Sequence, residues 1–542
     1  MTKHQNSSGR ISDSLSRRDV LRAGGLLLPA TLIAPTLFTR VSQAAGGTFD
    51  YYISTSGSDS NAGTLASPWA ITAINTKQSA YAGKRLGILP GTYDVSSLMF
   101  YGSAGHSAAL MINGGPNSST PTYIGTANSS GAYQANTAVL DAKGSSGFYG
   151  GSNSNNCTVI GACQGYSPGP ATPANWGNWI LDGLDIINFG PWAVQVGSYD
   201  GGGGPMPNCT IQNCRLYNGN ASFTTIGINS THGGPMVIYN QTNCLISNCL
   251  FNNNVNTGGN ATHWAAITSL SEGSASTGLV IQYCSFMQTS GFYGVEDTGS
   301  NTGTTIRYCY FDQTAFAGNP NTLAMSNGMN DTPGLPASSF HHNIVRGGSF
   351  YDNQALQAYT TAQNVSFYNN TWDRAGGSGS IGSGVRCVAK TGLVANYNNL
   401  IYDNGGGPLE YGYVAFNADA FKVCDYNIYG TAATFCTYGA NGGGLSASGL
   451  SFAAWKSAIG GLEVHSSTNT TNPFTNNGAY ALQYQIASGS PAYQAGRVGG
   501  VTSGAVCNVG AWDGTVTQIG YSSGGISGGI VQPKPPVLTT VS

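Results

Sequence analysis

The sequence predicts an all-β protein built as a single solenoid of parallel strands. Three observations support this prediction. One segment pattern recurs eight times along the chain, the apolar positions inside each segment follow strand spacing, and only 8% of the 542 residues are charged while 79 are Gly. A chain of this length can form one solenoid, because each repeat of a solenoid packs only on its neighbours. The 30 Tyr, 19 Phe and 8 Trp supply enough apolar surface for a continuous core.

The repeat is defined by a Cys or Asn at one fixed place, called here the register position. The eight segments are Cys209–Leu216, Cys244–Phe251, Leu279–Phe286, Thr304–Phe311, Ser338–Val345, Val365–Trp372, Val394–Ile401 and Lys422–Tyr429. Their register residues are Cys214, Cys249, Cys284, Cys309, Asn343, Asn370, Asn399 and Asn427, and the successive spacings are 35, 35, 25, 34, 27, 29 and 28 residues. Such spacings are typical of one solenoid coil with loops of varying length.

The apolar residues of each segment predict two strands joined by a bend. An apolar residue lies three positions before the register residue, as at Ile211 and Phe340, and another lies two positions after it, as at Leu216 and Trp372. On one straight strand these two positions would face opposite sides. A bend at the register position turns both inward, and Asn tolerates the left-handed backbone that such a bend needs. Asn residues on successive coils would then form a ladder of side-chain amides.

This Asn row resembles the asparagine ladder of the pectate-lyase-like superfamily of right-handed parallel β-helices. Phe49–Trp69 and Leu89-Pro-Gly-Thr-Tyr93 are similar to the opening of its secreted, polysaccharide-active members. Ser490–Gly496 and Val509-Gly-Ala-Trp512 are similar to their closing segment. The resemblance covers about residues 49–513. It implies a right-handed parallel β-helix, and it says much less about activity because one fold hosts many unrelated sites.

We expect three parts along the chain. Residues 1–45, with Arg17-Arg18 before a mildly apolar stretch, resemble a twin-arginine signal peptide. Residues 46–515 form the β-helix, with a short helix expected over Ser451–Ile459, and the Gly/Ser/Pro-rich residues 516–542 form a flexible tail. The expected mature chain has no membrane span and lies in the periplasm or outside the cell.

Charge and composition restrict the partners. Residues 1–45 hold six basic and two acidic residues, which leaves 14 basic and 20 acidic residues in the rest of the chain. An acidic chain without a basic cluster argues against nucleic acid. We therefore expect a polysaccharide partner and a monomer.

The cysteines allow two interpretations. Adjacent coils lie about 4.8 Å apart, within the Cα separation that a disulfide accepts. Cross-coil pairs 209–244, 214–249 and 284–309 are therefore possible in an exported protein, and Cys157–Cys163 could close a local loop. The alternative is a stack of buried thiols that behave as small apolar residues.

The resemblance implies a polymer-binding face, and the stretches upstream of the register strands are its candidates. A uronate lyase needs a base that removes the proton alpha to the sugar carboxylate, and a cation that neutralises that carboxylate. We expect Lys390 as the base and Arg386 as the carboxylate clamp. Calcium would be held by oxygen atoms of Glu296, Asp297, Asn330 and Asp331. Candidate sugar-contacting residues are His263, Trp264, Tyr293 and Tyr359.

Each candidate also has a structural interpretation. Lys390 can be a solvated side chain at a coil edge, and the aromatic residues can be ordinary half-buried members of their strands. Glu296 and Asp297 are adjacent, so only one of them can face a cleft. Isolated histidines such as His232, His263, His341 and His342 are most often structural.

Three functions remain open on the sequence alone. The favoured one is a calcium-assisted lyase that cleaves a uronic-acid polysaccharide by β-elimination. The second is a glycoside hydrolase with paired carboxylates, for which Asp331 could lie one coil from Glu296. The third is a non-catalytic surface or glycan-binding solenoid, which suits the low charge and the abundance of small polar residues.

Overall fold

A computed structural model of the chain separates two compact units, Met1–Gln43 and Ala44–Ser542, and the residues that it describes belong to the second unit. They are residues 47–98, 100–101, 106–143, 156–162, 177–190, 192–197, 206–221, 232–256, 263–270, 276–287, 293–298, 301–314, 321–325, 337–347, 365–373, 394–402, 409–414, 421–430, 433–438, 450–458, 460–476 and 480–523. The predicted signal peptide lies outside these ranges. Within them, no helix is both long enough and apolar enough to cross a membrane.

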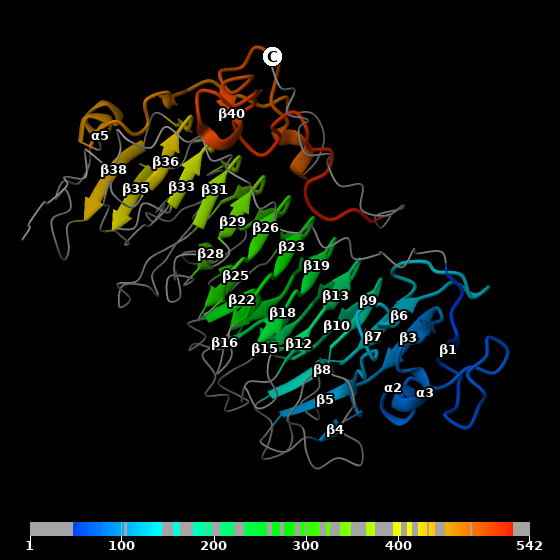
Figure 1. The fold of residues 1–542 in the computed structure, drawn as a ribbon. Helices are drawn as coiled ribbons and strands as arrows, with labels where there is room; N and C mark the ends of the chain where they lie inside the picture. Colours follow the sequence, from blue (N-terminus) through cyan, green and yellow to red (C-terminus); the bar gives the residue numbers. More distant parts are fainter. Residues whose placement is uncertain are drawn as a thin grey trace, which may run out of the picture. The chain divides into compact units, whose positions relative to one another are not determined.

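Three long sheets form the solenoid, and their strands stack one coil after another along its length (Figure 1). Sheet 1 has 12 strands, all paired in parallel. In spatial order they are β1 (Tyr51–Ile53), β2 (Arg85–Ile88), β6 (Thr122–Thr126), β9 (Trp179–Asp182), β13 (Cys209–Gln212), β19 (Leu245–Ser247), β23 (Val280–Gln282), β26 (Thr305–Arg307), β29 (Ser338–His341), β31 (Val365–Tyr368), β33 (Val394–Tyr397) and β36 (Phe421–Asp425).

Sheet 2 also has 12 parallel strands and follows sheet 1 across the bend of each coil. They are β3 (Gly91–Asp94), β7 (Ala138–Asp141), β10 (Asp185–Ile187), β14 (Arg215–Tyr217), β20 (Leu250–Asn252), β24 (Ser285–Met287), β27 (Tyr310–Asp312), β30 (Ile344–Arg346), β32 (Thr371–Asp373), β34 (Leu400–Tyr402), β37 (Ile428–Tyr429) and β39 (Ser467–Thr468).

Sheet 3 supplies the remaining long face, and all but one of its strand pairs are parallel. Its strands are β28 (Asn321–Met325), β25 (Tyr293–Thr298), β22 (His263–Leu270), β17 (Met236–Tyr239), β11 (Trp192–Val196), β8 (Asn156–Ala162), β5 (His106–Met111) and β4 (Phe100–Tyr101), with β16 (His232–Gly233) beside β22. Only β4 and β5 run antiparallel within this described sheet. The order of strands, paired in parallel with the strands of the coils before and after them, confirms the predicted parallel β-helix.

Short elements complete the described chain. Two-stranded pairs are β12 (Met206–Pro207) with β18 (Gln241–Thr242), β15 (Asn220–Ala221) with β21 (Val255–Asn256), β35 (Leu409–Val414) with β38 (Ala433–Tyr438), and β40 (Gly496–Arg497) with β41 (Val506–Cys507). The helices are α2 (Ala73–Thr76), α3 (Gln78–Tyr81), α5 (Phe452–Ala458) and the 3₁₀ turns η6 (Tyr480–Tyr484) and η7 (Val498–Gly500). Helix α5 confirms the short helix expected over Ser451–Ile459.

The two predicted apolar rows line the interior on either side of the bend. Ile211, Ile246, Ile281, Ile306, Phe340 and Phe367 are in register on sheet 1 and fully buried. On sheet 2 the matching row includes Phe251, Phe286 and Phe311, whose rings stack at centroid distances of 4.9 and 4.4 Å. Burying one such side chain stabilises the fold by about 1.5–3 kcal/mol, so these rows are the main apolar contribution of each coil.

The left-handed residue of the bend lies one position earlier than the sequence pattern suggested. Positive φ angles of 52–57° occur at the residue before the register position, and the register residues themselves are not left-handed. The left-handed residues are Asn213, Asn248, Tyr283, Tyr308, His342, Asn369, Asn398 and Tyr426. The side chain of the register residue points along the inner edge of the bend toward the next coil. The residue just before it therefore takes the left-handed backbone. We call these eight residues the outer bend row.

The register residues form the predicted ladder. Asn343, Asn370 and Asn399 each donate a side-chain N–H to the side-chain oxygen of the Asn one coil further on, at 3.2, 3.0 and 3.2 Å. At the end of the row, Asn427 donates to the buried carboxyl of Glu463 at 3.2 Å. Each amide therefore meets a partner in the dry interior, which an isolated buried amide would lack.

The four register cysteines continue the same ladder as thiols. Cys249, Cys284 and Cys309 place Sγ 3.7, 3.9 and 3.8 Å from a carbonyl oxygen of the preceding coil. Asn370 donates to the equivalent carbonyl of its own preceding coil at 2.9 Å. None of the proposed cross-coil disulfides 209–244, 214–249 and 284–309 is formed, and these residues are buried thiols. The pair Cys157–Cys163 cannot be judged, because the side chain of Cys157 and all of Cys163 lie outside the described residues.

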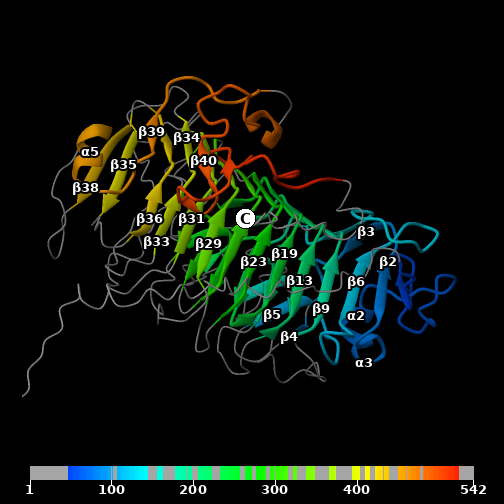
Figure 2. The ribbon, with the colours of Figure 1, turned by 45° about the horizontal axis from the view of Figure 1, so that its top comes forward.

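The C-terminal segment runs back over the outside of sheets 1 and 2 (Figure 2). Val509, Ala511, Trp512 and Ile519 are buried against Tyr310, Ile344 and Leu400 of sheet 2. Residues 516–523 of the stretch that the sequence assigned to a flexible tail are described. Within them Ile519 is buried and Tyr521 is hydrogen-bonded.

Candidate functional site

Three of the predicted sugar-contacting residues come together at one edge of sheet 3. His263 and Trp264 open β22, where their backbones pair with His232 and Gly233 of β16. Tyr293 opens β25 on the next coil and pairs with Ala265 of β22. The backbone register therefore gathers two His, one Trp and one Tyr at the starts of neighbouring strands. The side chains at these four positions, and all of Tyr359, lie outside the described residues.

The acidic pair on β25 is placed with its two side chains on opposite faces. Asp297 continues the row of Val196, Ile238 and Ser269, whose apolar members belong to the solenoid core. There it accepts a hydrogen bond from Asn301, which also contacts Ser269. Glu296 lies in the alternate row with Thr268 and is fully buried as well.

This placement bears on the calcium hypothesis. Glu296 and Asp297 cannot hold one ion together, because their side chains leave the strand on opposite sides. The other two proposed ligands, Asn330 and Asp331, lie outside the described residues. Within the described ranges no group of three or more His, Cys, Asp or Glu residues is arranged to hold a metal ion. Glu296 and Asp297, the described part of the predicted ligand set, thus do not fit a shared calcium ion. Lys390 and Arg386 also lie outside the described ranges.

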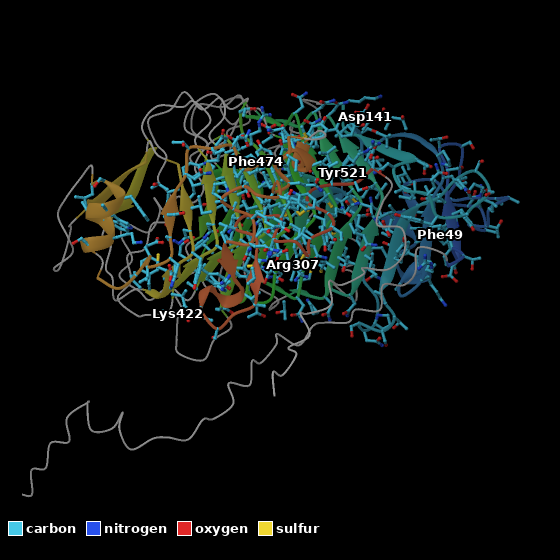
Figure 3. The ribbon with its side chains drawn as sticks, turned by 90° about the horizontal axis from the view of Figure 1, so that it is seen from above. Phe49, Asp141, Arg307, Lys422, Phe474 and Tyr521 are labelled. Atoms are coloured by element: carbon cyan, nitrogen blue, oxygen red, sulfur yellow. The ribbon has the colours of Figure 1, made fainter. Side chains whose placement is uncertain are left out.

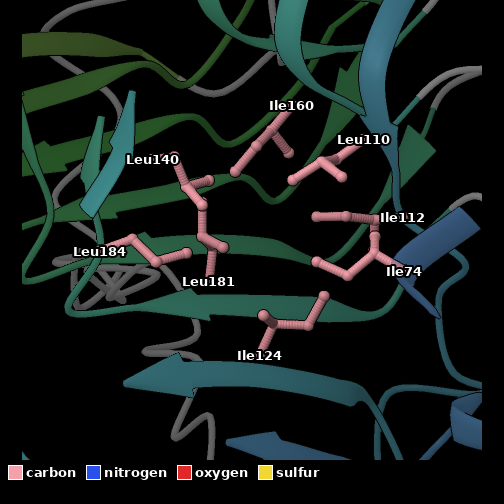
Figure 4. Close-up of a pocket in the computed structure, with 8 residues that line it drawn as sticks. All are labelled: Ile74, Leu110, Ile112, Ile124, Leu140, Ile160, Leu181 and Leu184. Carbon is pink, nitrogen blue, oxygen red and sulfur yellow. The ribbon is translucent and has the colours of Figure 1, made fainter. Parts of the chain in front are cut away.

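A pocket inside the solenoid offers no site for a sugar (Figure 4). Its lining is entirely aliphatic and consists of Ile74, Leu110, Ile112, Ile124, Leu140, Ile160, Leu181 and Leu184. All eight side chains belong to the hydrophobic core. Because none carries a hydrogen-bonding group, this space is part of the packing and not a binding site.

A cluster of titratable groups lies on the outer side of sheet 1, around His341 and His342. The Nδ1 atoms of the two rings are 2.7 Å apart, and Nε2 of His342 is 3.1 Å from Oδ2 of Asp513 in the C-terminal segment. The ring of His341 stacks on Tyr368 at 4.5 Å, and Tyr368 stacks on Tyr397 at 5.0 Å. Arg307 occupies the same row one coil earlier on the flank of the solenoid (Figure 3).

The partners of this cluster fix one of its protons. Asp513 only accepts when ionised, so Nε2 of His342 donates to it. Between the two Nδ1 atoms one ring donates and the other accepts, according to their tautomers. Burial lowers the pKa of His341 well below the usual histidine value, and the neighbouring His342 and Arg307 lower it further. Burial alone would raise the pKa of Asp513, but the hydrogen bond with His342 and those from Thr515 outweigh it and bring that pKa to about 2.

This cluster holds the C-terminal segment to the solenoid. Both rings are more than nine-tenths buried, which agrees with the structural interpretation of the histidines. Asp513 was not identified from the sequence, because it lies 171 residues from His342 and belongs to no repeat. One sequence signal pointed to the cluster, the adjacent pair His341-His342. His341 lies in the outward row of sheet 1, and His342 takes the left-handed backbone of the bend.

Comparisons with known proteins identify the architecture and no more. No protein-family model matches the chain, and no curated protein sequence matches it. Similar solved structures include a pectate lyase (14% identity, TM-score 0.43, covering 85% of this chain and 96% of that one) and a rhamnogalacturonan lyase (18%, 0.38, covering 65% and 81%). A lacto-N-biosidase from Eubacterium ramulus is also similar (9%, 0.37, covering 78% and 68%). These proteins act on different glycans, and at such scores they do not indicate which chemistry this chain performs.

Proposed function

We propose that this chain is an exported polysaccharide lyase that cleaves a uronic-acid-containing polymer by β-elimination with the help of calcium. The observation that carries the proposal is the edge of sheet 3, where the backbone register gathers His232, His263, Trp264 and Tyr293 on neighbouring coils. Aromatic and imidazole groups repeated at coil spacing suit an extended sugar chain lying along the solenoid. The resemblance of the Asn ladder and the closing segment to secreted polysaccharide-active β-helices supports the same function.

The roles within the proposal follow the chemistry of the reaction. Lys390 removes the proton alpha to the uronate carboxylate, and Arg386 binds that carboxylate as negative charge develops on it. Calcium, when bound, would neutralise the same charge. Glu296 is the described residue suited to contribute an oxygen to it, with Asn330 and Asp331 as the proposed further ligands.

Absorbance near 235 nm tests the proposal, because β-elimination leaves a conjugated double bond. The mature protein is mixed with a panel of uronate polymers, with calcium or with a chelator. We expect a calcium-dependent rise on at least one polymer, and loss of that rise in Lys390→Ala. Reducing ends released without absorbance would replace the lyase by a hydrolase. Binding without either product would favour a non-catalytic glycan-binding solenoid.

A further inference from the structure

The last described part of the chain, residues 496–522, follows the outer bend row from coil to coil. We call it the C-terminal strap. It meets Asn398 first, then Asn369, His342, Tyr308 and Asn248, which is the order of these coils read backward along the solenoid. Tyr521 extends the contact to Asn136, where its hydroxyl donates to the side-chain oxygen at 3.0 Å.

Two Asn side chains of the row bind the strap as a neighbouring strand would. Nδ2 of Asn398 donates to the carbonyl of Arg497 at 2.7 Å, and Oδ1 of Asn398 accepts from the amide of Arg497 at 3.2 Å. Asn248 repeats the arrangement with Ser522, at 3.2 Å from its carbonyl and 2.8 Å from its amide. Each amide side chain therefore satisfies both backbone groups of one strap residue.

Other residues fix the strap between these two points. Gly520 donates its amide to the carbonyl of Tyr308 at 2.8 Å, and Tyr521 donates its amide to the hydroxyl of Ser285 at 2.9 Å. Trp512 and Ile519 add buried apolar surface against sheet 2. The strap is thus held by polar and apolar contacts on most of the coils that it crosses.

We propose that the C-terminal strap is a longitudinal clamp, which couples coils that do not touch one another. In a solenoid each coil is stabilised only by its neighbours, so an end coil can open without disturbing distant coils. The strap connects the coil of Asn398 with that of Asn136, and seven strands of sheet 1, from β9 to β31, lie between β33 and β6. Separating the coils between these two points then requires breaking strap contacts. This inference does not depend on the proposed lyase activity.

Asn248→Gly in the full chain tests the clamp, because Gly keeps the left-handed backbone without strain and removes only the side chain. The matched control is Asn253→Gly. Asn253 is also left-handed, at φ 49°, and donates to Asn218 of the preceding coil at 2.8 Å, as Asn248 does to Asn213. Within the described residues, the strap forms hydrogen bonds with Asn248 and none with Asn253.

Hydrogen–deuterium exchange, resolved by peptide, gives the readout. In Asn248→Gly we expect at least about 10-fold faster exchange in residues 518–522 and also in residues 122–141, the farthest coil that the strap reaches, through Tyr521. In Asn253→Gly both regions should stay within about two-fold of the wild type. Faster exchange of the strap with unchanged exchange in residues 122–141 would refute the clamp, and so would an unchanged strap.

Tyr521→Phe provides a second test that leaves the fold intact, because it removes one hydroxyl and keeps the ring. The clamp requires faster exchange in residues 122–141, where the contact with Asn136 is lost, with little change near Asn398. Equal exchange in the variant and the wild type at residues 122–141 would overturn the proposal even if Asn248→Gly fails to fold.

Discussion

The buried imidazole of His341 should make the stability of the fold depend on pH in a mildly acidic range. In the folded chain the ring stays neutral, because burial, His342 and Arg307 all lower its pKa. In the unfolded chain it binds a proton below the ordinary histidine pKa of about 6.5. The unfolded state therefore gains a proton that the folded state does not, and stability falls as the pH falls below about 6.5.

The magnitude follows from the linkage between proton binding and folding. Each pH unit below 6.5 costs about 1.4 kcal/mol as long as the folded ring stays neutral. Lowering the pH from 6.5 to 5 should therefore remove about 2 kcal/mol of stability through this one residue. The groups that face the ring are His342, Tyr308 and Tyr368, with Arg307 one coil away.

Urea unfolding followed by circular dichroism between pH 5 and 8 measures this dependence. The perturbation is His341→Gln, which removes the titrating ring and should flatten the pH dependence by about 1.4 kcal/mol per unit below pH 6.5. Tyr368→Phe is the matched control, because it alters the same ring stack without a group that titrates in this range. Parallel curves for the wild type and His341→Gln would refute the reasoning.

Three further outcomes follow from the same structure. The pKa of Asp513 is lowered to about 2, so this carboxyl contributes about 2 kcal/mol of folding stability above pH 4, and the contribution is lost as the pH falls toward 2. In an acid-unfolding titration, Asp513→Asn should therefore lose less stability on acidification than the wild type. Asn370→Ala should lower the unfolding free energy by about 2–4 kcal/mol, because the side-chain amides of Asn343 and Asn399 lose their hydrogen bonds to Asn370. Chemical denaturation measures this cost. Cys249, fully buried as a thiol, should react with a thiol reagent only after denaturation, and mass spectrometry of the alkylated protein should show no link to Cys214.

The repeat predicted the parts of the fold that depend on neighbouring coils. The spacing of Ile211 and Leu216 around Cys214 predicted two inward rows and a bend, and the structure has both. The sequence pattern placed the left-handed residue of each bend one position too late along the chain, because Asn occurs both at the register position and just before it. Sequence preference alone does not separate those two positions.

Contacts between distant segments were not predictable in the same way. The strap meets Asn248 from 274 residues away, and nothing in its Gly- and Ser-rich sequence repeats the coil pattern. At the candidate site, the backbone places His263 and Tyr293 at the starts of neighbouring strands of sheet 3. The sequence anticipated that Glu296 and Asp297 would separate, but it could not show that Asp297 would turn inward onto Asn301. The candidates Lys390, Arg386, Tyr359, Asn330 and Asp331 remain predictions.

The two kinds of ladder differ in how strongly they link neighbouring coils. An Asn in the ladder donates to a carbonyl at 2.9–3.1 Å and also accepts from a backbone amide of the preceding coil, as Asn370 does from Asn343. A thiol reaches the equivalent carbonyl only at 3.7–3.9 Å and is a weak donor and acceptor. The coils of Cys249, Cys284 and Cys309 therefore have the weaker ladder. Strap contacts at Asn248, Ser285 and Tyr308 fall on these coils, and those at Asn398, Asn369 and His342 fall on coils of the Asn ladder. The clamp therefore adds links along both parts of the ladder, and its links on the thiol coils supplement the weaker bonds there.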